Sequence, residues 1–254
     1  MRKNPLENTL QFTVYASLLV QILTGVTDIY AIQLPIAPDL VILKKLLGIE
    51  IGVQVVEGIF YGWFASTFSH IENVTPSRYY DWVITTPSML ITLCIYLDFI
   101  NHRNSNVVEK KTDIEQPDHL EPDDKATPRY ATSLMESFQK NKATLIPILL
   151  LNWMMLFFGY LGEINVLPTA VSVALGFIPF FLYFTMIYVQ YAKYTVTGRT
   201  LFWVFAAIWS LYGVAAMLFY YWKNIGYNVL DLFAKNFFGV FLAYVVYQQY
   251  HIVA

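Results

Sequence analysis

The sequence is poor in charged residues and contains a single cysteine. Only 13% of its 254 residues are Asp, Glu, Lys or Arg, whereas soluble domains carry about 25%. Hydrophobic residues make up 57% of the chain, so the composition argues against a soluble globular protein and for an integral, multi-pass membrane protein. The formal net charge of −2 gives no general attraction to nucleic acid. Cys94 stands alone, so no internal disulfide is possible.

Seven windows are long and apolar enough to cross a bilayer as helices, which takes roughly 20 mostly apolar residues each. They cover residues 9–33, 46–69, 78–100, 143–162, 166–192, 199–222 and 226–249. Prolines, glycines and capping residues separate them. Helices are expected because backbone exposed to lipid must satisfy its own hydrogen bonds. We therefore predict an all-α membrane protein, with one seven-helix domain over residues 1–254.

The basic residues predict the orientation of this bundle. Residues 102–142 form a long hydrophilic connection between the third and fourth helices, and this connection is rich in Lys and Arg. With the N-terminus outside, the inner connections hold Lys44, Lys45, Arg103, Lys110, Lys111, Lys125, Arg129, Lys140, Lys142, Lys193 and Arg199. The outer side holds Arg2, Lys3 and Lys223, apart from Arg78 at a helix entrance. The positive-inside rule then favours an outer N-terminus, an inner C-terminus and a cytoplasmic 102–142 loop.

Two predicted helices carry charged residues of both signs. Arg78 and Asp81 lie three residues apart in the third helix, and Asp231 and Lys235 lie four apart in the seventh. Charges at membrane depth are costly, so these side chains are expected to face the bundle interior and to have partners. One interpretation is a structural ion pair between Asp231 and Lys235. The other is a lysine that forms a Schiff base with a carbonyl compound.

Aromatic residues of the third and sixth helices favour the second interpretation. Trp82 follows Asp81 directly, and Trp209 and Tyr212 lie in the middle of the sixth helix. These rings could simply be part of the core. Together with a lysine imine, they could also enclose an elongated conjugated chromophore, with Asp81 and Asp231 as counter-ions and Arg78 balancing the excess negative charge.

Polar residues also follow one face of the first two helices. Glu50 and Glu57 are seven residues apart, about two helical turns, so they lie along one stripe. In the first helix, Ser17 and Asp28 share a face with Gln21 and Thr24. The acids could be protonated and hydrogen-bonded to neighbours. Facing a polar pathway, they would instead concentrate cations.

The segments RYYDWVITTP (78–87) and DLFAK (231–235) closely resemble the third and seventh helices of microbial rhodopsins. The resemblance implies all-trans-retinal bound to Lys235 as a Schiff base. It implies Asp81 as counter-ion and proton acceptor, Asp231 as second counter-ion, and Arg78 beside them. The implied retinal pocket consists of Trp82, Thr85, Thr86, Met89, Met155, Gly159, Trp209 and Tyr212. The chain departs from the family pattern at Gly213, usually Pro, and at Thr92, where bacteriorhodopsin has the inner Asp that donates a proton.

The second-helix acids narrow the resemblance to viral rhodopsins of group 1, which implies a light-gated channel for monovalent cations (Na, K, H) in a host cell membrane. The implied ion pathway consists of Ser17, Glu50, Glu57, Asn228 and Asn236, with Glu57 at a central constriction and Glu50 at an inner one. An outward light-driven proton pump is the alternative, and a photosensor ranks third. We expect no enzymatic activity, and the sequence assigns no metal site. Retinal, membrane lipid and cations are the expected partners, a homo-oligomer is compatible, and nucleic acid is not expected.

Overall fold

The computed structural model describes residues 5–70, 72–115 and 133–253. Within them the chain forms seven long α-helices and no strand, which confirms the predicted all-α class. The helices are α1 (Pro5–Gln33), α2 (Val41–Thr67), α3 (Arg78–Glu115), α4 (Leu134–Glu163), α5 (Thr169–Gln190), α6 (Val196–Ala216) and α7 (Tyr220–Val253). Short 3-10 turns at Pro38–Leu40, Phe68–His70, Thr75–Ser77 and Ala192–Tyr194 join some of them.

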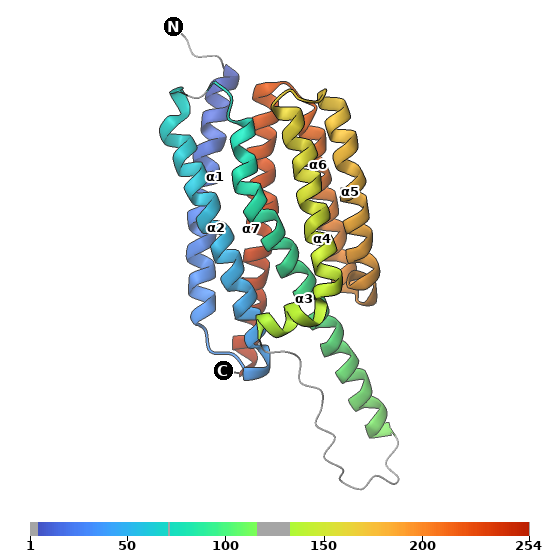
Figure 1. The fold of residues 1–254 in the computed structure, drawn as a ribbon. Coiled ribbons are helices and arrows are strands. Elements are labelled where there is room, and N and C mark those ends of the chain that lie inside the picture. Colours follow the sequence, from blue (N-terminus) through green and yellow to red (C-terminus); the bar gives the residue numbers. More distant parts are fainter. Residues whose placement is uncertain (1–4, 71, 116–132, 254) are drawn as a thin grey trace.

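The helices run side by side, and the two termini lie at opposite ends of the bundle (Figure 1). We call these ends the N-terminal side and the C-terminal side. Helices α1, α3, α5 and α7 run from the N-terminal to the C-terminal side, and the others run back. Apart from the longer stretch between α3 and α4, the connections are short, and a short loop leaves consecutive helices antiparallel.

Local sequence signals define several helix ends. Pro38 and Pro76 open 3-10 turns, where a missing N–H costs nothing. Pro168 is the residue before α5. The Thr195 hydroxyl caps α6 by accepting a hydrogen bond of 2.9 Å from the Gly198 N–H. Asn165, in the turn after α4, has a φ of 59°, a left-handed conformation that asparagine adopts more readily than most residues.

Several helices extend beyond the predicted apolar windows. Helix α3 continues to Glu115 and α4 begins at Leu134, so the described helices enter the 102–142 segment that we predicted as a loop. Its central part, 116–132, lies outside the described residues. The discrepancy arises because an apolar window marks the membrane crossing, whereas a helix can continue into water with its backbone bonds intact.

The outer surface carries the apolar residues that a membrane protein presents to lipid. Phe12 is 71% exposed and Trp203 62% exposed. Among the described residues, six helices are long and apolar enough to span a membrane. Helix α2 is the seventh, and its length of 27 residues is also sufficient, but Glu50 and Glu57 interrupt its apolar sequence.

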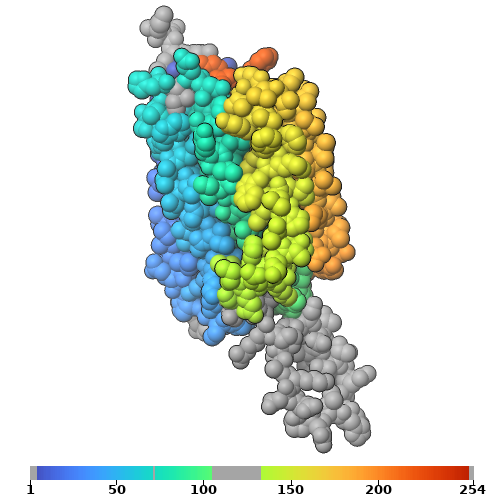
Figure 2. Space-filling view, viewed as in Figure 1, coloured from blue at the N-terminus to red at the C-terminus, as the bar shows by residue number. Residues whose placement is uncertain are grey.

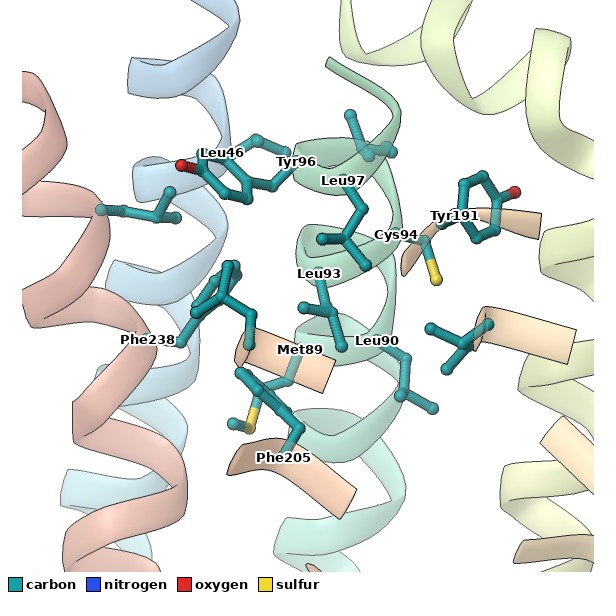
Figure 3. Packing of buried hydrophobic residues seen from close by; sticks show 14 of the residues in the cluster. Leu46, Met89, Leu90, Leu93, Cys94, Tyr96, Leu97, Tyr191, Phe205 and Phe238 are labelled. Carbon is teal, nitrogen blue, oxygen red and sulfur yellow. The ribbon is translucent and has the colours of Figure 1, made fainter. Parts of the chain in front are cut away.

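The main apolar core surrounds α3 in the C-terminal half of the bundle. Leu93 and Leu97 of α3 lie beside Phe238 of α7 in this core (Figure 3). On the face shown in Figure 2, α3 reaches the surface between α2 and α4. This packing fills the C-terminal half of the bundle around α3. The buried polar residues of α1 and α2 lie on the other flank of α3.

Candidate functional site

The amine of Lys235 on α7 lies among three carboxyl groups in the middle of the bundle. Its Nζ is 2.5 Å from Asp81 Oδ2 on α3 and 2.8 Å from Glu57 Oε2 on α2. The Asp231 carboxyl, one turn before Lys235, is 3.7 Å away. The lysine is only 2% exposed. Residues from three helices therefore meet here, and Asp81 makes the shortest contact with the lysine.

Two tyrosines hold Asp231 on its other sides. The hydroxyl of Tyr61 donates to Asp231 Oδ2 at 2.7 Å, and that of Tyr212 donates to Oδ1 at 2.7 Å. Tyr61 belongs to α2, four residues after Glu57, and Tyr212 belongs to α6. Each carboxylate oxygen thus has a donor, which stabilises Asp231 as an anion.

Arg78 lies directly above this cluster, on its N-terminal side, and is fully buried. Its Nη1 is 3.4 Å from Asp231 Oδ2, and its Nε donates to Asn224 Oδ1 at 3.0 Å. A further short bond joins its Nη2 to Asn228 Oδ1. Arg78 thus pairs with Asp231, while the shortest contact of Lys235 is with Asp81. Asp81 therefore contacts Lys235, whereas Asp231 lies between the two cations.

An apolar cavity extends from Lys235 on α7 to Phe177 on α5. The space in it that the centre of a water-sized sphere can occupy is about 110 Å³. Seven of the predicted pocket residues line it: Trp82, Thr86, Met89, Met155, Gly159, Trp209 and Tyr212. Thr85, the eighth, does not line it; its hydroxyl donates to the Asp81 carbonyl at 3.1 Å.

Two glycines make room at the end of the cavity away from Lys235. A Cβ on Gly159 would lie 2.6 Å from the Tyr79 hydroxyl, and one on Gly213 would lie 2.5 Å from the Phe177 ring. The indole nitrogens of Trp82 and Trp209 are buried without a hydrogen-bond partner among the described residues. An apolar, aromatic-lined cavity with an amine at one end fits a long conjugated aldehyde such as retinal.

The Thr86 hydroxyl joins the cavity wall to α4. It accepts a hydrogen bond of 2.8 Å from Asn152 Nδ2 and donates to the Trp82 carbonyl at 2.8 Å. Asn152 is fully buried at the middle of its helix. This contact fixes α3 against α4 beside the cavity.

The predicted pathway residues line a buried polar region between α1, α2 and α7. On the N-terminal side, the Ser17 hydroxyl donates to the Asn228 carbonyl at 3.2 Å, and Asn228 Nδ2 donates to Thr13 at 2.8 Å. Near Lys235, Gln54 Nε2 donates to the Lys235 carbonyl at 3.1 Å. On the C-terminal side, the structure places Glu50, Asn236 and Asp28, all at least 96% buried.

Sequence reasoning placed Glu57 at a constriction and did not anticipate its direct contact with Lys235. It also left Tyr61, Asn224 and Tyr227 out of the site. Helical spacing could have identified Asn224. It lies four residues before Asn228 and so shares a helix face with the predicted residues. Tyr227 contacts Arg78 through its ring, whose centroid is 5.5 Å from the guanidinium carbon.

A buried lysine held by carboxyl groups, at the end of an aromatic cavity in a seven-helix membrane bundle, defines a retinal-protein type of site. The chain belongs to the bacteriorhodopsin-like protein family, whose model matches residues 8–249. Membership implies a retinal chromophore and places the chain among light-responsive membrane proteins that transport ions or sense light.

Solved structures agree with this assignment. The viral rhodopsin OLPVRII has 25% identity and a TM-score of 0.70, covering 92% of this chain and 95% of that one. A thermophilic rhodopsin has 16% identity and a TM-score of 0.69, with coverages of 98% and 96%. Xanthorhodopsin, described as a light-driven ion pump with a dual chromophore, has 14% identity and a TM-score of 0.67, with coverages of 97% and 95%. Curated protein sequences include no significant match.

Proposed function

We propose that this protein is a light-gated channel for monovalent cations. The observation that carries the proposal is the buried polar region between α1, α2 and α7, which continues on both sides of Lys235. Polar side chains at membrane depth are expensive unless they line a pathway or have partners. A channel needs such a route to become continuous for a time, whereas a pump needs a closed barrier at every stage.

The route has a different character on each side of the lysine. On the N-terminal side, Arg78, Asn228 and Ser17 form a hydrogen-bonded network that joins α1, α3 and α7. On the C-terminal side, Glu50 and Asn236 extend the polar face. Glu57 stands between these two regions in contact with Lys235. We therefore assign Glu57 to the central constriction and Glu50 to an inner one.

Retinal, when bound at Lys235, supplies a light-driven isomerisation that changes the direction in which the lysine nitrogen points. The chain's own residues respond to that change. Asp81 is placed to accept the proton of the nitrogen, since its Oδ2 lies 2.5 Å from Nζ. Loss of that charge pair weakens the attraction that holds Glu57 and Asp81 around one cation. Helix α2, which carries Glu57, is then free to separate from α7 along the polar route.

The orientation and location follow from the basic residues. Lys44, Lys45 and Arg199 lie at the C-terminal side of the bundle, and Lys223 lies at the other end. The positive-inside rule thus places the N-terminus outside and the 102–142 segment in the cytoplasm. The resemblance to viral rhodopsins adds a host cell membrane as the proposed location.

An outward proton pump is the second candidate. The short contact between Asp81 and Lys235 favours it, because a proton acceptor at that distance also begins a pump cycle. Xanthorhodopsin, which shares the fold, is described as a pump. No described feature favours a photosensor in the same way.

Photocurrents under voltage clamp in cells expressing the protein distinguish the two candidates. A channel current reverses sign at a voltage that follows the sodium and potassium gradients. A pump current stays outward over the whole voltage range. An outward current that is indifferent to sodium and potassium would refute the channel.

A Glu57→Gln variant tests the central constriction. The carboxyl contacts Lys235 at 2.8 Å, and a charge-assisted contact of this kind contributes about 1.5–3 kcal/mol. We expect the photocurrent amplitude to change by roughly tenfold or more, since about 1.4 kcal/mol corresponds to a factor of ten. Glu72→Gln, at an exposed position between α2 and α3, is the matched control. An unchanged conductance in Glu57→Gln would remove Glu57 from the gate.

A further inference from the structure

Two carboxyl groups on the C-terminal side of Lys235 have no cationic partner among the described residues. Asp28 of α1 and Glu50 of α2 are both 0% exposed. Among the described residues, neither Asp28 oxygen has a hydrogen-bond partner, and the Glu50 carboxyl has only the neutral Thr92 hydroxyl within reach, without a well-formed hydrogen bond. This contrasts with Asp81 and Asp231, which hold Lys235, Arg78 or a tyrosine.

The two acids lie at increasing depth between the C-terminal side and the lysine. Asp28 lies five residues before the end of α1 at Gln33, or about 7.5 Å along the helix. Glu50 lies nine residues after α2 begins at Val41, or about 13.5 Å deep. Gln54 follows one turn deeper and donates to the Lys235 carbonyl.

Neighbouring helices shape the space around both acids. Thr92 of α3 lies beside the Glu50 carboxyl, and Asp28 is the charged group in electrostatic reach of it. Helix α7 faces Asp28 with Gly239, where an added Cβ would be only 2.6 Å from Asp28 Oδ2. Thr92 and Gly239 are uncharged. Among the described residues, no cation acts on the Asp28 or Glu50 carboxyl.

An unpaired carboxylate enclosed in a membrane protein is too costly to persist, so such a group holds a proton or receives one readily. Two such acids lie one after the other on the way to the lysine. They can therefore store protons, unlike carboxylates that are held in structural ion pairs. Thr92 has no acidic proton to supply at its own position on α3. The carboxyl beside it on α2 does.

We propose that Glu50 is the internal proton donor to the nitrogen of Lys235, and that Asp28 relays protons to Glu50 from the C-terminal side. After Asp81 has taken the proton from the nitrogen, the Glu50 carboxyl releases its proton, which crosses the polar region past Gln54 and binds the nitrogen, while the Gln54 amide keeps its own hydrogens. The nitrogen regains its positive charge, and Glu50 becomes a carboxylate. Asp28 then protonates Glu50 and recovers a proton from solvent on the C-terminal side.

The proposal deepens the proposed function and rests on it in one respect, namely that light moves the proton from the nitrogen to Asp81. It also explains how Glu50 could act as an inner constriction. A neutral acid blocks the route for cations at rest, and its anion attracts them after the transfer.

The resting protonation state can be measured without retinal. Infrared spectra of the retinal-free protein, with glutamate carboxyls labelled by ¹³C, should show the stretching band of a protonated carboxylic acid that shifts with the label. Glu50→Gln should lose this band, and Glu136→Gln, at an exposed position in the first turn of α4, should keep it. A wild-type protein without any protonated glutamate band would overturn the proposal.

Flash spectroscopy of the retinal-loaded protein tests the transfer itself. In Glu50→Gln, reprotonation of the nitrogen should slow by roughly 10²-fold, the typical contribution of a positioned proton donor. Azide, a small permeant weak acid, should restore the rate, and Glu50→Asp should keep part of it. Unchanged reprotonation in Glu50→Gln, or slowing that azide does not relieve, would overturn the proposal. Failure of the channel proposal would instead appear in the photocurrent reversal, which these experiments do not use.

Discussion

The contact between Gly239 and Asp28 allows a sharp test of how α1 packs on α7. In Gly239→Ala, the new Cβ would lie 2.6 Å from Asp28 Oδ2 and 3.4 Å from its Cγ. Side-chain carbons do not approach an oxygen that closely, so the carboxyl or the helix must move by several tenths of an ångström. Both residues are in helices, and Asp28 is fully buried, which leaves little room for the movement.

Two opposing effects determine the magnitude. Replacing glycine by alanine inside a helix stabilises it by about 1 kcal/mol. Overpacking a close-fitting interior costs about 1–3 kcal/mol. We therefore expect Gly239→Ala to lower the free energy of unfolding by up to about 2 kcal/mol. Where Asp28 is replaced by Ala, the clash is gone, and Gly239→Ala should instead stabilise the protein by about 1 kcal/mol.

The assay is thermal unfolding in one detergent of the wild type, Gly239→Ala, Asp28→Ala and the double variant. A change of 1 kcal/mol shifts Tm by roughly 2–4 °C for a chain of this size. The double-mutant cycle should give a coupling of about 1–3 kcal/mol. Asp28→Asn with Gly239→Ala is the control that removes charge and retains volume, and it should keep the clash. If Gly239→Ala raised Tm equally in all three backgrounds, the packing described here would be wrong.

Two further predictions concern the site around the lysine. Lys235→Ala should give a protein that shows no visible absorption band when retinal is added, because the amine at the end of the cavity is lost. Tyr61→Phe should lower the free energy of unfolding by about 1.5–3 kcal/mol, because it removes a hydrogen bond of 2.7 Å to the Asp231 anion. Thermal unfolding measures the second effect, and absorption spectroscopy measures the first.

Matched controls exist for both variants. Lys223 lies at the other end of α7 and pairs with Glu163 at 3.0 Å, so Lys223→Ala should keep the visible band. A coloured Lys235→Ala protein would contradict the assignment of the linkage. Tyr15 is 50% exposed, and Tyr15→Phe should leave Tm unchanged. Equal Tm values for Tyr15→Phe and Tyr61→Phe would show that the Asp231 contact contributes nothing.

The sequence alone determined those features that depend on neighbours along one helix. Apolar length predicts that the chain crosses the membrane as helices, because each helix satisfies its own backbone hydrogen bonds. Spacing of four residues places Asp231 and Lys235 on one face, and spacing of seven places Glu50 below Glu57. The segments around Asp81 and Lys235 also suffice for the family resemblance, which the family match over residues 8–249 confirms.

Only the tertiary structure decided which side chains meet across helices. Nothing in the sequence assigns Arg78 to Asp231, because helical spacing relates Arg78 to Asp81 on the same helix and says nothing about an aspartate on α7. The contact of Glu57 with Lys235 depends on how α2 packs against α7. The lack of charged partners for Glu50 and Asp28 depends on how α1, α2, α3 and α7 pack together. Pairing between helices is set by the shape and packing of whole surfaces, whereas helix formation is set by residues within a few turns.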